Sequence, residues 1–169
     1  MGQLTPRLVA DNLAAQVAFD RAVLVADAGA RWAPINANHM LTSGSSLFHP
    51  DFQRIVHRSP TNQQRLLAAV PGERWADYLV TERRLGRRWL GELGGIEWLT
   101  AFAPVAPGDI RAFLPGIASP AELAPDQVEA LGAGISAVLG LYAELGFESF
   151  NLALYGAPRG RRGMSSTCA

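Results

Sequence analysis

Two long segments of the chain repeat apolar residues at helical spacing. Between residues 6 and 27, apolar residues such as Val9 and Leu13 recur without an interrupting glycine or proline. Between residues 125 and 145, apolar residues form one stripe, and Gly146 follows where a helix would end. Both segments are predicted to be helices.

A third region of roughly helical spacing, residues 61–85, contains the pair Pro71-Gly72. Proline has no backbone N–H and its ring clashes with the preceding turn, so a helix does not pass through it. The region is therefore predicted to form two separate helices.

Short runs of apolar residues bounded by turn residues predict strands. Six such runs occur, at residues 31–38, 48–58, 88–93, 97–103, 109–114 and 147–155. The run at 147–155 is predicted to be the final strand. This order of strands and helices predicts an α/β or α+β fold with a mostly antiparallel sheet.

Composition narrows the class of protein. The 169 residues are 49% apolar, enough for the core of one ordinary domain or two small ones. The formal net charge is zero, which gives no global electrostatic reason to expect a nucleic acid or an anionic membrane as partner. Cys168 is the one cysteine, and the N-terminus lacks the apolar core of a signal peptide, so we expect a soluble, cytoplasmic protein.

Residues 38–53 hold the candidate chemistry. A turn of small residues, Ser43-Gly44-Ser45-Ser46, follows Asn38, and small residues let a backbone approach a phosphate closely. The run His49-Pro50-Asp51-Phe52-Gln53 comes next, and in an extended strand its His, Asp and Gln share one face. A phosphate-binding turn followed by three polar side chains on one face indicates an active-site strand; an ordinary polar turn is the alternative.

This segment is similar to a motif of the galactose-1-phosphate uridylyltransferase family, a branch of the histidine-triad superfamily. The family pattern Asn-x5-Gly-x-Ser-x2-His-Pro-His-x-Gln is met at the same spacing by Asn38, Gly44, Ser46, His49, Pro50 and Gln53. Asp51 stands where the family has its second histidine. The resemblance extends through residues 97–104, 114–115 and 150–158, so it covers most of the chain.

The resemblance implies an α+β fold, a histidine-triad-like, mostly antiparallel sheet with packed helices. Residues 1–58 would be the end of a first histidine-triad-like half, a helix plus the active-site strand. Residues 59–169 would be a second half that is short at its C-terminus. The family's cysteine metal ligands and its later histidine-rich strand have no counterpart here, so no metal site and no cofactor are expected within this chain. A homodimer is implied as well.

The family transfers UMP from a UDP-sugar to a hexose 1-phosphate through a uridylyl-histidine. The resemblance puts Asp51 in the nucleophile position, Gln53 and Ser46 on the phosphates, and His49 in an orienting role. Asn38, Ser43, Gly44 and Ser45 would complete the substrate-binding set. The expected partner is a nucleoside diphosphate sugar or a sugar phosphate.

The aspartate leaves a second interpretation open. A carboxylate repels the phosphates by about 1–4 kcal/mol at contact distance, depending on the effective dielectric constant. It would also form an acyl phosphate, which is labile. The alternative to a nucleotidyltransferase is therefore a catalytically silent module that binds a nucleotide or sugar phosphate, or another protein.

Overall fold

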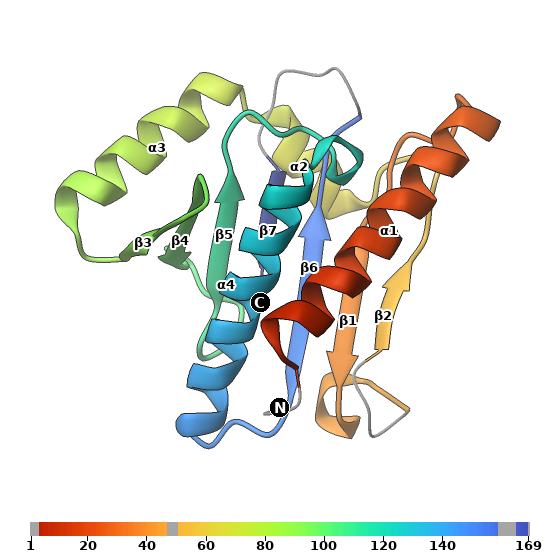
Figure 1. The fold of residues 1–169 in the computed structure, drawn as a ribbon. Helices are drawn as coiled ribbons and strands as arrows, with labels where there is room; N and C mark the ends of the chain where they lie inside the picture. Colours follow the sequence, from red (N-terminus) through yellow and green to blue (C-terminus); the bar gives the residue numbers. More distant parts are fainter. Residues whose placement is uncertain (1–3, 47–50, 159–164, 169) are drawn as a thin grey trace.

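The computed structural model describes residues 4–46, 51–158 and 165–168, and it shows one antiparallel sheet of seven strands (Figure 1). The spatial order is β2-β1-β6-β7-β5-β4-β3. The strands are β1 (Ile35–His39), β2 (Asp51–Arg54), β3 (Trp89–Leu93), β4 (Ile96–Thr100), β5 (Ile110–Leu114), β6 (Phe150–Tyr155) and β7 (Ser165–Cys168). The predicted α+β class and antiparallel sheet are confirmed.

Four α-helices accompany the sheet in the described part of the chain: α1 (Pro6–Ala26), α2 (Asn62–Ala69), α3 (Gly72–Leu85) and α4 (Pro125–Glu144). Two 3₁₀ turns, η1 (Leu41–Ser43) and η2 (Pro120–Glu122), lie between elements. The helices at 6–27 and 125–145 and the break at Pro71 are as predicted. No described helix is long and apolar enough to cross a membrane.

Local signals explain where these helices begin and end. The Thr5 hydroxyl accepts a hydrogen bond from the Leu8 N–H, and Pro6 follows at the first helical position of α1. Thr61 and Gln64 form a reciprocal capping box at the start of α2. Gly146 follows α4 with φ of 81°, a left-handed conformation that favours glycine.

Helices α1 and α4 pack side by side on one face of the sheet (Figure 1). A Cβ atom at Gly132 of α4 would lie 2.8 Å from the Ala10 backbone nitrogen of α1, so the two helices approach closely only because this position is glycine. Their apolar stripes meet alternate residues of the strands. This main core includes Val9, Leu13, Ile35, Ala37, Leu131, Ile135, Leu152 and Leu154.

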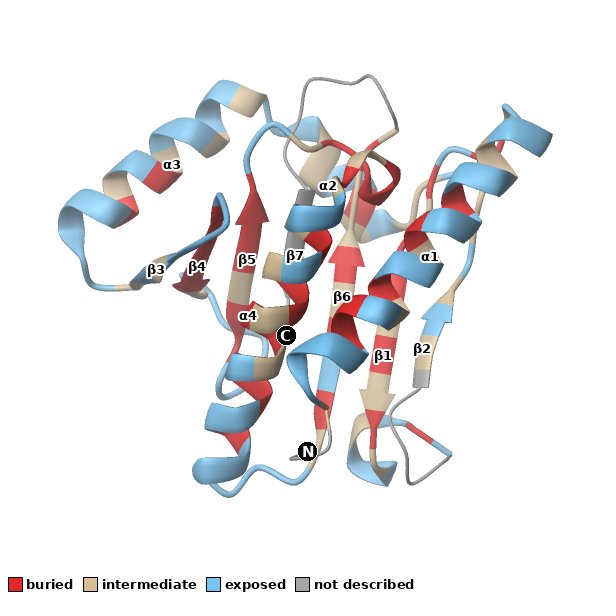
Figure 2. Ribbon diagram, in the orientation of Figure 1, coloured by how far each residue is buried: buried red, intermediate tan, exposed pale blue. Residues whose placement is uncertain are grey.

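The opposite face is divided between two environments. Over β3, β4 and β5, helix α3 adds a second cluster in which Leu79 packs with Leu99 and Phe113. Over β1 and β6, burial alternates along each strand (Figure 2). Because successive residues of a strand point to opposite faces, the less buried positions face away from α1 and α4. The exposed part of this second face is where the polar residues of the candidate site gather.

A helix–strand–strand arrangement occurs twice in the chain. α1 leads to β1 and β2, and α4 leads to β6 and β7. β1 and β6 pair in the middle of the four strands, from Ile35 opposite Leu154 to His39 opposite Phe150. Residues on both sides of position 58 share one sheet and one core. The assignment of 1–58 and 59–169 to two histidine-triad-like halves stays a prediction.

The strand predictions differ from the structure at several places. β2 ends at Arg54 and β4 at Thr100, short of the predicted 58 and 103. Residues 147–155 do not contain the last strand, because β7 follows and pairs with both β5 and β6. The Ser-Ser-Thr-Cys sequence of β7 lacks the alternation that marks a strand, and it completes a sheet whose flanking edges would otherwise stay unpaired. The strand predicted at 31–38 starts at Ile35, because Pro34 lacks an N–H; an isolated bridge joins Trp32 to His57 beyond it.

Candidate functional site

The strand register brings four polar positions together on the exposed part of the second face. Asn36 of β1 lies opposite Gln53 of β2, and Asn38 lies opposite Asn151 of β6. Directly paired residues project from the same side of a sheet. The amide side chains of these four residues therefore share one face, and the backbone of Asp51, opposite Asn38, occupies the same register row.

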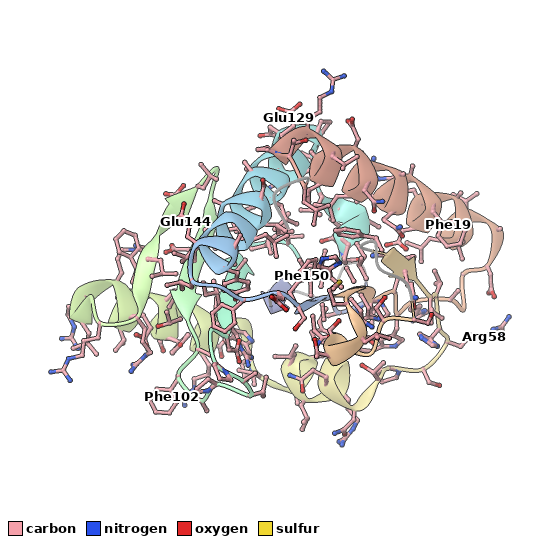
Figure 3. The ribbon with its side chains drawn as sticks, turned by 90° about the horizontal axis from the view of Figure 1, so that it is seen from below. Phe19, Arg58, Phe102, Glu129, Glu144 and Phe150 are labelled. Atoms are coloured by element: carbon pink, nitrogen blue, oxygen red, sulfur yellow. The ribbon has the colours of Figure 1, made fainter. Side chains whose placement is uncertain are left out.

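A cavity of about 530 Å³ opens beside these residues. Its lining includes Asn36, Asn38, Ser43, Asn151 and Tyr155. The β4–β5 connection and the end of α4 supply the remaining wall. Figure 3 looks at the molecule from this end, with Phe150, the first residue of β6, near the middle of the view. The volume lies within the usual range for small-molecule sites.

The turn after β1 is closed on itself by hydrogen bonds. The Met40 carbonyl accepts from the N–H groups of Ser43 (3.1 Å) and Ser45 (3.2 Å), and the Leu41 carbonyl accepts from Gly44 (2.9 Å). Met40 has φ of 71° and ψ of 161°, a conformation that glycine normally occupies. A phosphate at this turn would have to compete for the three N–H groups, so the turn is not an open cradle in this conformation.

The predicted site residues fall into three groups. Asn38, Ser43 and Gln53 lie at or beside the cavity face, and Gln53 is exposed. Gly44 has the left-handed φ of 85°, Ser45 is buried and Ser46 is exposed. His49 lies outside the described residues, and only the backbone of Asp51 is described. The functional roles assigned to all of them remain predictions.

Sequence reasoning missed Asn36, Asn151 and Tyr155 as residues of the cavity. A signal for the asparagines was present, since asparagine is depleted in strands. β1 and β6 each have strand neighbours on both sides, and together they carry three asparagines. Polar residues placed against local propensity mark candidate functional positions.

The described lining of the cavity carries no lysine, arginine or histidine. Among the described lining residues, Asp109 is the one carboxylate. It is buried and accepts hydrogen bonds from Arg111 (3.1 and 2.9 Å) and from the Val105 N–H (3.1 Å). The Tyr142 hydroxyl donates to the Gly108 carbonyl, and burial raises the pKa of Tyr142 to about 12. Tyr142 therefore stays protonated at neutral pH and is unsuited to act as a base.

Helix α1 holds β2 from the core side. Arg54 forms a buried ion pair with Asp20, with 2.6 Å between Nε and Oδ1. One helical turn earlier, the Gln16 side chain donates to the Phe52 carbonyl at 3.4 Å. The Phe52 and Arg54 side chains lie on the core side of β2 and alternate with Gln53, so Gln53 projects from the opposite face.

His39 lies on the core side of the sheet, away from the cavity. His39, adjacent to the turn in sequence, is buried on the core side against Phe150, with ring centroids 5.5 Å apart. It does not line the cavity. Within residues 4–46, 51–158 and 165–168, no cluster of three or more His, Cys, Asp or Glu side chains could hold a metal ion.

Solved structures share this arrangement over the whole chain. An ADP-glucose phosphorylase from Arabidopsis thaliana, with bound ADP-glucose, matches 99% of this chain at a TM-score of 0.79 and 14% sequence identity. A uridylyltransferase matches with a TM-score of 0.76 and 16% identity, again over 99% of the chain. The chain has the uridylyltransferase fold. The resemblance predicted from the motif is thus confirmed in the fold.

The uridylyltransferase-fold relatives are longer than this chain. It spans 58% of the ADP-glucose phosphorylase, 57% of the uridylyltransferase, and 60% of a GalT-like protein from Arabidopsis thaliana that matches with a TM-score of 0.75 and 12% identity. In sequence, an uncharacterized protein of Archaeoglobus fulgidus is 25% identical over 143 residues, which are 78% of this chain and 42% of that protein. No family model matches the chain.

Proposed function

We propose that this chain binds a nucleoside diphosphate sugar on the exposed face of β1, β2 and β6 and belongs to a nucleotidyltransferase of the hexose-1-phosphate uridylyltransferase type. The observation that carries the proposal is the register of β1 with β2. It sets Asn38 opposite Asp51, and Asn36 opposite Gln53, beside a cavity of small-molecule size. The bound ADP-glucose of the phosphorylase with this fold adds support.

In the proposed reaction, an Asp51 carboxylate oxygen attacks the α-phosphorus of the nucleotide sugar. The bond between that phosphorus and the bridging oxygen breaks, and the hexose 1-phosphate leaves with the electron pair. The resulting acyl phosphate passes the nucleotidyl group to an incoming hexose 1-phosphate, which regenerates the carboxylate. Gln53 would donate hydrogen bonds to the phosphate oxygens, where negative charge develops.

A second candidate function is a catalytically silent binding module. Two observations favour it: aspartate replaces the family's nucleophilic histidine, and the described lining of the cavity offers no cationic side chain to offset phosphate charge. A silent module that binds a nucleotide or sugar phosphate differs from the first candidate in turnover, whereas a silent module that binds another protein would differ in ligand binding as well.

Ligand binding tests the shared part of the proposal. A ligand at 100 times its dissociation constant stabilises the folded state by about 2.7 kcal/mol, which raises the thermal midpoint. UDP-glucose, ADP-glucose, UMP, AMP and galactose 1-phosphate would be compared. A dose-dependent rise with at least one nucleotide sugar is expected. A folded sample whose midpoint stays constant with all five would contradict the proposal.

Turnover separates the two candidates. If Asp51 is the nucleophile, the natural chain exchanges label between UDP-glucose and glucose 1-phosphate, and Asp51→Asn abolishes the exchange. If the chain is a silent module, the natural chain shows no exchange, and Asp51→His, which restores the family residue, is the variant in which exchange would appear.

We further propose a homodimer. β2 and β3 are the edges of the described sheet, and unpaired strand edges favour pairing with another chain. Light scattering of the purified chain at several concentrations gives its mass directly. A mass equal to one chain throughout would contradict the dimer.

A further inference from the structure

The side-chain amides of Asn36, Asn38 and Asn151 all line the cavity, and the structure gives none of them a hydrogen-bond partner among the described residues. Each amide offers two N–H donors and a carbonyl acceptor. Asn38 and Asn151 lie directly opposite each other across the β1–β6 pair, and Asn36 is two residues from Asn38 on the same face. Three unpartnered amides thus form one continuous row on the cavity floor.

The chemistry of this floor suits a neutral, hydroxyl-rich group. Sites for phosphate use arginine, lysine, a metal ion or free backbone N–H groups. The described lining has no cationic side chain, and the N–H groups of Ser43, Gly44 and Ser45 in the neighbouring turn are already hydrogen-bonded within it. A sugar hydroxyl donates one hydrogen bond and accepts others, which complements the mixed donors and acceptors of an amide row.

Three aromatic residues of the cavity wall, Tyr142, Phe147 and Phe150, do not form a slot for a nucleobase. Tyr142 and Phe147 pack edge-to-face on each other, with centroids 5.5 Å apart and an interplanar angle of 70°. Phe150 is buried and packs against His39 on the core side. Sites that stack a base present the open face of an aromatic ring. These three rings supply an apolar wall beside the amide row.

Opposite Asn36, the floor carries a small residue. Ala153 of β6 pairs with Asn36 and lines the same cavity. Its methyl group leaves space above the sheet between Asn36 and Asn151 that a longer side chain would fill.

From these observations we infer that the cavity holds the hexose of the nucleotide sugar and that Asn36, Asn38 and Asn151 select it through its hydroxyl groups. The phosphates would then lie toward β2, beside Gln53, with the nucleoside beyond them. This inference rests on the proposed function, because it assigns one end of the same ligand to one part of the same site.

Calorimetric titration of the natural chain and single variants with UMP, UDP-glucose and glucose 1-phosphate tests the assignment. Asn151 is exposed, so Asn151→Ala leaves the core unchanged. We expect it to weaken UDP-glucose and glucose 1-phosphate about 3- to 10-fold, the loss of one or two neutral hydrogen bonds, and to change UMP affinity less than about 2-fold. Asn62→Ala, at an exposed asparagine on α2, is the matched control and should change none of the three.

A steric variant provides an independent measurement. Ala153→Leu should exclude the two sugar-containing ligands and leave UMP binding intact, with the fold checked by circular dichroism. Equal weakening of UMP and UDP-glucose, or no weakening in either variant, would overturn the hexose assignment while the proposed function stands. If none of the three ligands binds the folded natural chain, the proposed function and this inference both fail.

Discussion

The buried ion pair between Asp20 and Arg54 gives the sharpest stability prediction. The two side chains are 1% and 3% exposed, and they join α1 to the edge strand β2. Burial lowers the pKa of Arg54 to about 9, so the guanidinium is still charged at neutral pH. Removing one member leaves a buried charge without a counter-ion, which costs about 3–5 kcal/mol.

That cost is large compared with the 5–15 kcal/mol that stabilises a typical domain. With a urea m-value of about 2 kcal/mol per molar, Arg54→Met or Asp20→Leu should lower the unfolding midpoint by about 1.5–2.5 M. The double variant Asp20→Leu/Arg54→Met should recover most of the loss, because it buries no unpaired charge. Tryptophan fluorescence in urea measures all three.

The surface pair between Arg58 and Asp27 serves as the control. Its side chains are 76% and 39% exposed, so Arg58→Met should cost under about 1 kcal/mol. Single variants at Asp20 or Arg54 that cost no more than this control, or a double variant as unstable as the sum of the two singles, would refute the reasoning.

Three further predictions concern single residues. Burial lowers the pKa of His39, so the unfolded state binds the proton first as pH falls below about 6.5. The free energy of unfolding should therefore fall by up to about 1.4 kcal/mol per pH unit in acid. His39→Phe should remove that part of the slope in urea titrations from pH 7 to 5, and an unchanged slope would contradict the prediction. Met40→Gly should raise the thermal midpoint, because it relieves a positive φ that costs about 1–3 kcal/mol and adds a glycine entropic cost of only about 0.5–1 kcal/mol. A lower midpoint would show that the Met40 side chain stabilises the fold by more than the strain costs. Gly134→Ala should destabilise the protein by about 1–3 kcal/mol, because its Cβ would lie 2.0 Å from the Trp98 ring. Gly140→Ala in the same helix meets open space and should stabilise the protein by about 0.4–1 kcal/mol. Equal effects of the two variants in calorimetry would contradict the packing argument.

Local sequence signals predicted the elements that depend on them. The N-terminal prolines of α1 and α4, the break at Pro71 and the strands of the region 88–114 are all encoded within a few neighbouring residues. β7 was missed because its sequence has no strand signal of its own, and its place is set by the unpaired edges of β5 and β6.

The candidate site was predictable in part for the same reason. The motif from Asn38 to Gln53 is continuous in sequence, so its spacing is visible there. Asn151 and Tyr155 reach the same cavity only through the pairing of β1 with β6, a long-range register that no local pattern reveals. The self-closed hydrogen bonds around the Met40 carbonyl likewise depend on backbone angles that the composition of the turn does not specify.

The side-chain amide resonances of asparagine and glutamine test the central claim most directly, because they report on the proposed ligand-binding face itself. In ¹⁵N-resolved NMR of the chain titrated with UDP-glucose, we predict saturable shifts of the side-chain NH₂ signals of Asn36, Asn38, Asn151 and Gln53, with Asn62 unchanged. Shifts confined to other residues, or none at ligand concentrations far above the millimolar range, would contradict a nucleotide-sugar site on this face.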